Sequence, residues 1–110
     1  MKISLHVGLK AEDKATEYLI DIGYSIFERN FHSRFGEIDI VASKNNILHF
    51  FEVKYSKKYD PIGRITPKKL QKIIKTIDYY MYKKDIDLDF QIDALLLSDT
   101  TIEIVENISY

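Results

Sequence analysis

The sequence contains no cysteine among its 110 residues. This absence excludes disulfide scaffolds, thiol nucleophiles and cysteine-ligated zinc or iron–sulfur sites, and it is compatible with a reducing compartment. The chain also lacks any apolar run near the roughly 20 residues that cross a bilayer, and its N-terminus lacks the apolar stretch of a signal peptide. We therefore expect a cytoplasmic protein with no membrane partner.

Hydrophobic residues make up 45% of the chain and aromatic residues 13%, which is enough for a real core. Disorder requires low hydrophobicity and high net charge, and the formal net charge is only −1. A chain of this length falls in the range of one domain, because a second core would lack apolar surface. The sequence predicts a single domain that spans residues 1–110.

Charge is unevenly distributed along the chain. Residues 54–84 contain 10 Lys/Arg and 2 Asp/Glu, a balance of +8, whereas residues 85–110 contain 7 acids and no Lys or Arg. A basic block is a candidate footprint for a polyanion, and the alternative is a solvated lysine-rich helix balanced by an acidic edge. Within this block, the nucleic-acid hypothesis assigns the phosphate contacts to Lys68, Lys69, Lys72 and Lys75.

Hydrophobic periodicity predicts two helices. The first ends near Ile22, where Gly23 follows as a C-terminal cap. The second begins after Thr66 as N-cap, with Pro67 at the first helical position, and has an apolar stripe of Leu70, Ile73, Ile74, Ile77 and Met81. Five strands are predicted over residues 24–29, 37–42, 47–54, 90–97 and 101–108. This order predicts an α/β fold in which helices flank a mixed sheet.

Chemistry-bearing side chains gather on the hairpin of the second and third predicted strands. Alternation along a strand places Glu52 and Lys54 on one face. If residues 43–46 form a four-residue loop, Asp39 lies opposite Phe50, and Asp39, Glu52 and Lys54 converge on one side of the sheet. The geometry is sensitive, because a loop one residue longer or shorter would move Asp39 to the other face.

Two converging carboxylates in a buried sheet stay ionised only if cations compensate them. Lys54 supplies one positive charge, and a hard divalent cation such as Mg²⁺ or Mn²⁺ supplies the rest. The alternative is a structural salt bridge between Lys54 and an acid at the hairpin end. Glu12 on the first helix reaches over the sheet in the first hypothesis, and in the alternative it is an ordinary exposed helix acid. His49 points away from Glu52 by strand alternation, which favours a core or surface role over a metal role.

Four ordered motifs extend this pattern over nearly the whole chain. They are Gly8-x-x-Ala11-Glu12, Arg29-Asn30, Gly36-Glu37-Ile38-Asp39-Ile40 and Phe51-Glu52-Val53-Lys54, followed by Gly63 and Ile65-Thr66-Pro67-Lys68-Lys69. With these motifs the chain resembles the YraN-type family of small uncharacterised bacterial proteins. That family is similar to the PD-(D/E)xK nuclease superfamily and, within it, to the archaeal Holliday junction resolvases.

The resemblance implies a restriction-endonuclease-like αβββαβ core with Asp39 and Glu52 as metal ligands and Lys54 as the catalytic lysine. It also implies that Glu12 completes the acidic site and that Lys69 is the family's second-helix lysine. At two positions the chain lacks an arginine that is usual in the family, having Ser56 after the catalytic lysine and Gln91 in the fourth strand.

We therefore expect a metal-dependent endonuclease that uses Mg²⁺ or Mn²⁺ to hydrolyse nucleic-acid phosphodiester bonds, with DNA favoured over RNA as the partner. A role on two-fold symmetric junctions would be compatible with a homodimer. Two alternatives are a non-catalytic nucleic-acid-binding module on a nuclease scaffold and a protein-interaction domain.

Overall fold

The computed structural model describes residues 3–57 and 65–109, with side chains from Lys10 onward in the first helix. Asp60-Pro61 and Gly63 are turn-forming residues that predict a loop before the second helix, and they lie outside the described residues. The elements, in chain order, are α1 (Ile3–Asp21), β1 (Ser25–Ser33), β2 (Gly36–Lys44), β3 (Ile47–Tyr55), α2 (Pro67–Lys84), β4 (Asp89–Leu97) and β5 (Ile102–Val105). Neither described helix is long and apolar enough to cross a membrane.

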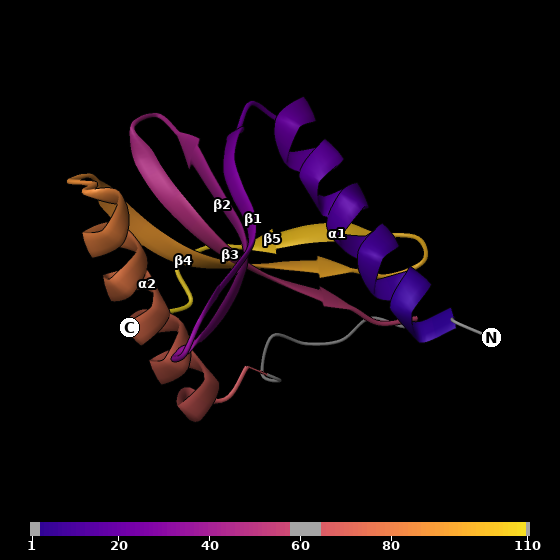
Figure 1. Ribbon diagram of the computed structural model, residues 1–110. Helices are drawn as coiled ribbons and strands as arrows, with labels where there is room; N and C mark the ends of the chain where they lie inside the picture. Colours follow the sequence, from indigo (N-terminus) through magenta and orange to yellow (C-terminus); the bar gives the residue numbers. More distant parts are fainter. Residues whose placement is uncertain (1–2, 58–64, 110) are drawn as a thin grey trace.

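The strands form one mixed sheet in the order β1-β2-β3-β4-β5. β3 and β4 are parallel, and the other neighbouring pairs are antiparallel. Helix α2 makes the crossover between the two parallel strands, and α1 and α2 lie on opposite sides of the sheet (Figure 1). The predicted α/β fold with a mixed sheet flanked by helices is confirmed, and the element order is consistent with a restriction-endonuclease-like core followed by β5.

Each face of the sheet has its own hydrophobic cluster because the strand side chains alternate. Leu19 of α1 packs with Phe51 and Leu95 on one face. On the other face, Ile77 of α2 packs with Phe50. The central strand β3 is therefore covered on both sides, as its apolar sequence predicts.

The predicted helix ends are confirmed. Gly23 follows α1 with a φ of +102°, a left-handed conformation that favours glycine. The Thr66 hydroxyl accepts a hydrogen bond of 3.2 Å from the Lys69 N–H, and Pro67 is the first residue of α2. The predicted stripe of α2 is wrong at Ile74, which is 39% exposed.

The connection between β2 and β3 is shorter than predicted. Lys44 pairs with Ile47, so only Asn45 and Asn46 form the turn, with φ values of 53° and 64°. Two consecutive left-handed residues form a type I′ turn, whose twist matches that of the strands, and asparagine tolerates this conformation. The predicted register, with Asp39 opposite Phe50, is therefore wrong. The true register is shifted by two residues, and a shift of two preserves which side chains share a face.

Candidate active site

The site lies where β2 separates from β3. The pairing of these strands runs from Lys44 with Ile47 to Ile40 with Phe51. Two residues beyond Phe51, the Val53 N–H donates a hydrogen bond of 2.7 Å to Oδ2 of Asp39, the neighbour of Ile40. The Asp39 carboxylate therefore replaces a backbone partner that β2 no longer offers, which holds Asp39 beside Glu52.

Along β2, the side chains switch from one face of the sheet to the other near Asp39, so Asp39 is accessible from both faces. Ile40 packs in the cluster under α1, whereas Ile38, two residues earlier, packs in the cluster under α2. Regular alternation would place these two side chains on one face. In the neighbouring strand β1, Asn30 has a φ of 52°, a conformation that breaks the regular extended chain. Asp39 lies between the two isoleucines, so groups from both helices can approach it.

Asp39 has an unusually basic carboxylate. Burial and then the neighbouring negative charge of Glu52 raise the pKa of Asp39 to about 7, although the hydrogen bond from the Val53 N–H lowers it. Near neutral pH this pair of carboxylates is therefore ready to take up either a proton or a cation. Raised pKa values of this kind cluster at functional sites.

Glu12 approaches the same point from α1. Burial, and next the charge of Asp39, raise the pKa of Glu12. Its Oε1 atom is buried and has no hydrogen-bond partner among the described residues, and the Nη2 atom of Arg29 lies 3.9 Å away. That Nη2 atom is closer to Asp13, at 2.8 Å. A buried carboxylate oxygen without a partner fits a site that receives a cation.

Glu12, Asp39 and Glu52 are farther apart than the ligands of a fully formed metal site. Within residues 10–57 and 65–109, Glu12, Asp39 and Glu52 do not bring one oxygen each within 4.8 Å of one another. Asp39 and Glu52 are hydrogen-bonded neighbours, and Glu12 is the more distant member. The structure thus fits a divalent ion held by Asp39 and Glu52, with Glu12 able to complete the site only after a shift.

Lysines approach the acids from two elements. The Lys69 Nζ of α2 lies 3.4 Å from Oε1 of Glu52, whose side chain is only 11% exposed. Lys54, two residues after Glu52 on β3, is half-buried, and no acid among the described residues lies within ion-pair distance of its ammonium group. The structural salt bridge considered for Lys54 is therefore not found in the described part of the chain.

A lysine-lined cavity includes Lys69, the ion-pair partner of Glu52. Its volume is about 410 Å³, and Lys68, Lys69 and Lys72 of α2 line it together with Gly36 and Glu37 of β2. Lys75 is exposed but does not line the cavity. It lies on the same side of α2 as Lys68 and Lys72, because residues spaced by three and four share a helix face. Three of the four lysines assigned to nucleic acid thus border one hollow beside Glu52.

Two members of the site were not expected from the sequence in their observed roles. Lys69 was assigned to nucleic acid but pairs with Glu52, and Arg29 was noted only as part of a motif but lies between Glu12 and Asp13. These partners are 17 and 16–17 positions apart in the sequence. Helix and strand periodicity predicts contacts only between residues a few positions apart, so these pairs could be identified only from the folded structure.

Comparison with known proteins shows one family. The model of the uncharacterised protein family UPF0102 matches residues 11–97. A UPF0102 protein of Campylobacter fetus is 49% identical over 104 residues, which cover 94% of this chain and 93% of that protein. A UPF0102 protein of Helicobacter pylori is 52% identical over 103 residues, covering 94% and 90%, and one of a Nitratiruptor species is 48% identical over 103 residues, covering 94% and 92%.

Proposed function

The chain belongs to the UPF0102 family, and we propose that it is a metal-dependent endonuclease that hydrolyses nucleic-acid phosphodiester bonds, with DNA preferred over RNA. The observation that carries this proposal is the pair of adjacent carboxylates, Asp39 and Glu52, where β2 leaves β3, with the pKa of Asp39 raised to about 7. Membership of the PD-(D/E)xK nuclease superfamily is part of the proposal. The αβββαβ order of the elements supports it, as do the acids on β2 and β3 and the lysine two residues after Glu52.

In this proposal, Asp39 and Glu52 hold one Mg²⁺ or Mn²⁺ ion through their oxygens, which hard cations prefer. When bound, such an ion supplies Lewis acidity toward a phosphoryl oxygen. The Lys54 ammonium group stabilises the negative charge that develops on the phosphate during attack by water. Glu12 adds a third anionic group from α1, and its unpartnered oxygen is available for this purpose.

The lysines of α2 bind the nucleic-acid backbone in this proposal. Lys68 and Lys72 border the cavity beside Glu52, and Lys75 extends the basic surface along the same face of the helix. Lys69 has a second role, because it neutralises Glu52 in the absence of a cation. With a divalent ion bound beside Glu52, Lys69 would be available to bind a phosphate.

One observation favours a second candidate function, that of a nucleic-acid-binding module without catalysis. The Lys69–Glu52 ion pair of 3.4 Å gives Glu52 a cation from the protein itself. If this pair persisted in the presence of Mg²⁺, the scaffold would keep its basic helix but lose one metal ligand. Metal binding by the isolated protein therefore separates the two candidates.

Asp39→Asn is expected to weaken Mg²⁺ binding by about tenfold or more, which corresponds to about 1.4 kcal/mol or more. The reason is that a neutral amide cannot replace an anionic ligand, although it still accepts the hydrogen bond from the Val53 N–H. Isothermal titration calorimetry with Mg²⁺ measures this change. Asp78→Asn, at an exposed position of α2, is the matched control and should bind as the wild type does. Equal affinity in all three proteins would remove the metal from the proposal.

Binding of duplex DNA is expected to weaken steeply with salt, with a log–log slope of about −0.9 for each phosphate contacted. Lys72→Ala should reduce the magnitude of this slope by about 1, because one phosphate contact is lost. Fluorescence anisotropy at several salt concentrations, in EDTA to prevent cleavage, gives the slope. Lys14→Ala, on the exposed side of α1, should leave it unchanged. A slope near zero in the wild type would mean that the basic helix is merely solvated.

A further inference from the structure

A second group of ionisable side chains lies on the face of β3 away from Glu52. His49 of β3 and Asp93 of β4 are buried, with exposed fractions of 5% and 0%. Glu106, just after β5, is exposed. Ligand atoms of these three residues lie within 4.8 Å of one another, and among the described residues no other group of three His, Asp or Glu side chains does so.

Asp93 holds His49 in a defined orientation. The Asp93 Oδ1 atom accepts hydrogen bonds of 2.9 Å from the Gln91 side chain and from the Asn107 N–H. Its Oδ2 atom lies 2.7 Å from Nδ1 of His49. Stacking on Phe51, with 17° between the rings, and an edge contact with Tyr24 fix the imidazole plane. A carboxylate that binds one nitrogen of an imidazole orients the other, and this arrangement recurs behind metal-binding histidines.

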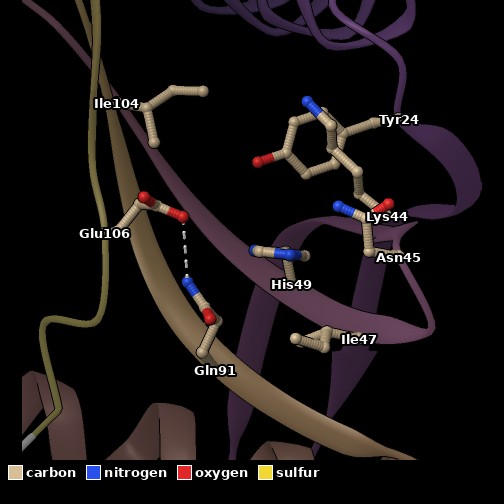
Figure 2. A pocket seen from close by; sticks show the side chains of 8 residues that line it. All are labelled: Tyr24, Lys44, Asn45, Ile47, His49, Gln91, Ile104 and Glu106. Carbon is tan, nitrogen blue, oxygen red and sulfur yellow. Dashed lines mark hydrogen bonds between the residues drawn. The ribbon is translucent and has the colours of Figure 1, made fainter.

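The other side of the His49 ring faces a cavity of about 360 Å³. Among the described residues, Nε2 of His49 has no hydrogen-bond partner. In Figure 2 the His49 ring and the Glu106 carboxylate both point into this cavity, and the dashed line marks the 3.3 Å bond from Gln91 that holds Glu106 in place. The cavity therefore presents an imidazole nitrogen and a carboxylate to a ligand.

Among the described residues, Asp93 is ion-paired only with His49, when that imidazole is protonated, and Glu106 has no ion-pair partner. Asp93 and Glu106 carry two negative charges when ionised. Lys44 also lines the cavity, but its Nζ donates a hydrogen bond of 2.8 Å to the Ile22 carbonyl and lies 5.0 Å from the centre of the Tyr24 ring. The negative charges of Asp93 and Glu106 also contribute, after burial, to raising the pKa of Tyr24, whose ring lines the same cavity. A divalent cation matches this excess of charge.

We propose that Nε2 of His49 and the carboxylate of Glu106 bind one divalent transition-metal ion such as Zn²⁺, with Asp93 holding the His49 ring from behind. An imidazole beside a carboxylate favours Zn²⁺ and its neighbours over Mg²⁺, which prefers oxygen ligands alone. The bound ion joins β3 to the segment that follows β5. In that segment the Ile108 N–H already donates a hydrogen bond of 2.8 Å to the Ile92 carbonyl of β4. The ion would therefore stabilise a segment that is already held against β4.

Zinc titration of the full chain tests this proposal. The double variant Asp39→Asn/Glu52→Gln serves as the background, because it removes the proposed nuclease ligands, and it should still bind one Zn²⁺ per chain. In this background Glu106→Gln should weaken Zn²⁺ binding by about tenfold or more, the range seen when a group that supports a metal site is removed. Glu106 is exposed, so the variant is expected to stay folded.

Glu103→Gln is the matched control, since Glu103 is an exposed acid of β5 that pairs opposite Leu96 and does not line the cavity. Zn²⁺ should also raise the melting temperature of the background variant but not of its Glu106→Gln derivative. Two outcomes would overturn the proposal: loss of the zinc ion in the background variant, or equal zinc affinity with Glu106→Gln and Glu103→Gln. Either result is independent of whether the chain cleaves nucleic acid.

Discussion

Glu52→Gln is expected to abolish nucleic-acid cleavage, and Lys54→Ala is expected to reduce turnover by about a hundredfold or more. The two residues have different roles in the proposed mechanism. Glu52 loses its anionic oxygen on replacement and can no longer hold the cation with Asp39. Lys54 has no acidic partner in the described part of the chain, so its removal leaves metal binding intact and affects only the charge that develops on the phosphate.

Cleavage assays should offer branched, flapped, single-stranded and duplex DNA, as well as RNA, with Mg²⁺ and Mn²⁺ in turn. Calorimetry on the same preparations separates the two effects, because Glu52→Gln should lose Mg²⁺ affinity and Lys54→Ala should keep it. Lys57→Ala and Glu17→Gln, both at exposed positions, are the matched controls. If the wild type cuts none of the substrates above the Lys54→Ala background but still binds DNA, the chain is a binding module rather than a nuclease.

Asp39→Asn is expected to stabilise the metal-free protein at alkaline pH by about 2 kcal/mol. The pKa of Asp39 is about 7 in the folded protein and has its ordinary value of 3.8 in the unfolded chain. Between these values the folded state binds more protons, so the free energy of unfolding falls as pH rises from about 4 to 7. One pKa unit corresponds to about 1.4 kcal/mol, and we expect less than the full sum because Asp39 is half-buried and hydrogen-bonded to Glu52.

Urea denaturation in EDTA at pH 5 and pH 8 measures this effect. The wild type should lose stability between the two values, whereas Asp39→Asn should lose much less, because asparagine does not ionise. The difference in stability between the two proteins should be smaller at pH 5 than at pH 8. Asp78→Asn, at an exposed position, should behave like the wild type. A wild type that is equally stable at both values, or a variant with the same dependence on pH, would contradict the strained Asp39–Glu52 pair.

Much of the fold follows from local patterns in the sequence. Gly23, Thr66 and Pro67 end or begin the helices where the patterns predict, because capping depends on residues within one turn of the helix end. The length of the β2–β3 turn was predicted wrongly, as four residues instead of two. Ser43 and Lys44 look like loop residues, yet they pair with Leu48 and Ile47 because Asn45 and Asn46 alone can make the turn. The polar composition of a segment does not say how many of its residues are needed to reverse the chain.

The convergence of Asp39 and Glu52 was predicted despite the wrong register. From Ile40 to Lys44 the error of two residues leaves every side chain of β2 on its predicted face. Beyond Ile40 the pairing ends, and Asp39 is placed beside Glu52 by the hydrogen bond that it accepts from the Val53 N–H and by its hydrogen bond to Glu52. The approach of Glu12 toward Asp39 was suggested by the family resemblance, and the structure brings Glu12 near enough for the charge of Asp39 to raise its pKa, without closing the ligand set.

By itself, the sequence determined the helices and their caps, the existence of the strands and the faces that Glu52 and Lys54 share, because these depend on neighbours a few positions away. Only the tertiary structure decided which distant groups meet. Glu52 receives Lys69 from α2, and His49 meets Asp93 across 44 positions. The His49–Asp93 pair depends on the parallel alignment of β3 with β4. The Glu52–Lys69 pair depends on how α2, which connects these two strands, packs on the sheet. The alignment of β3 with β4 is set by the burial of the whole sheet, so it cannot be predicted from any short stretch of the sequence.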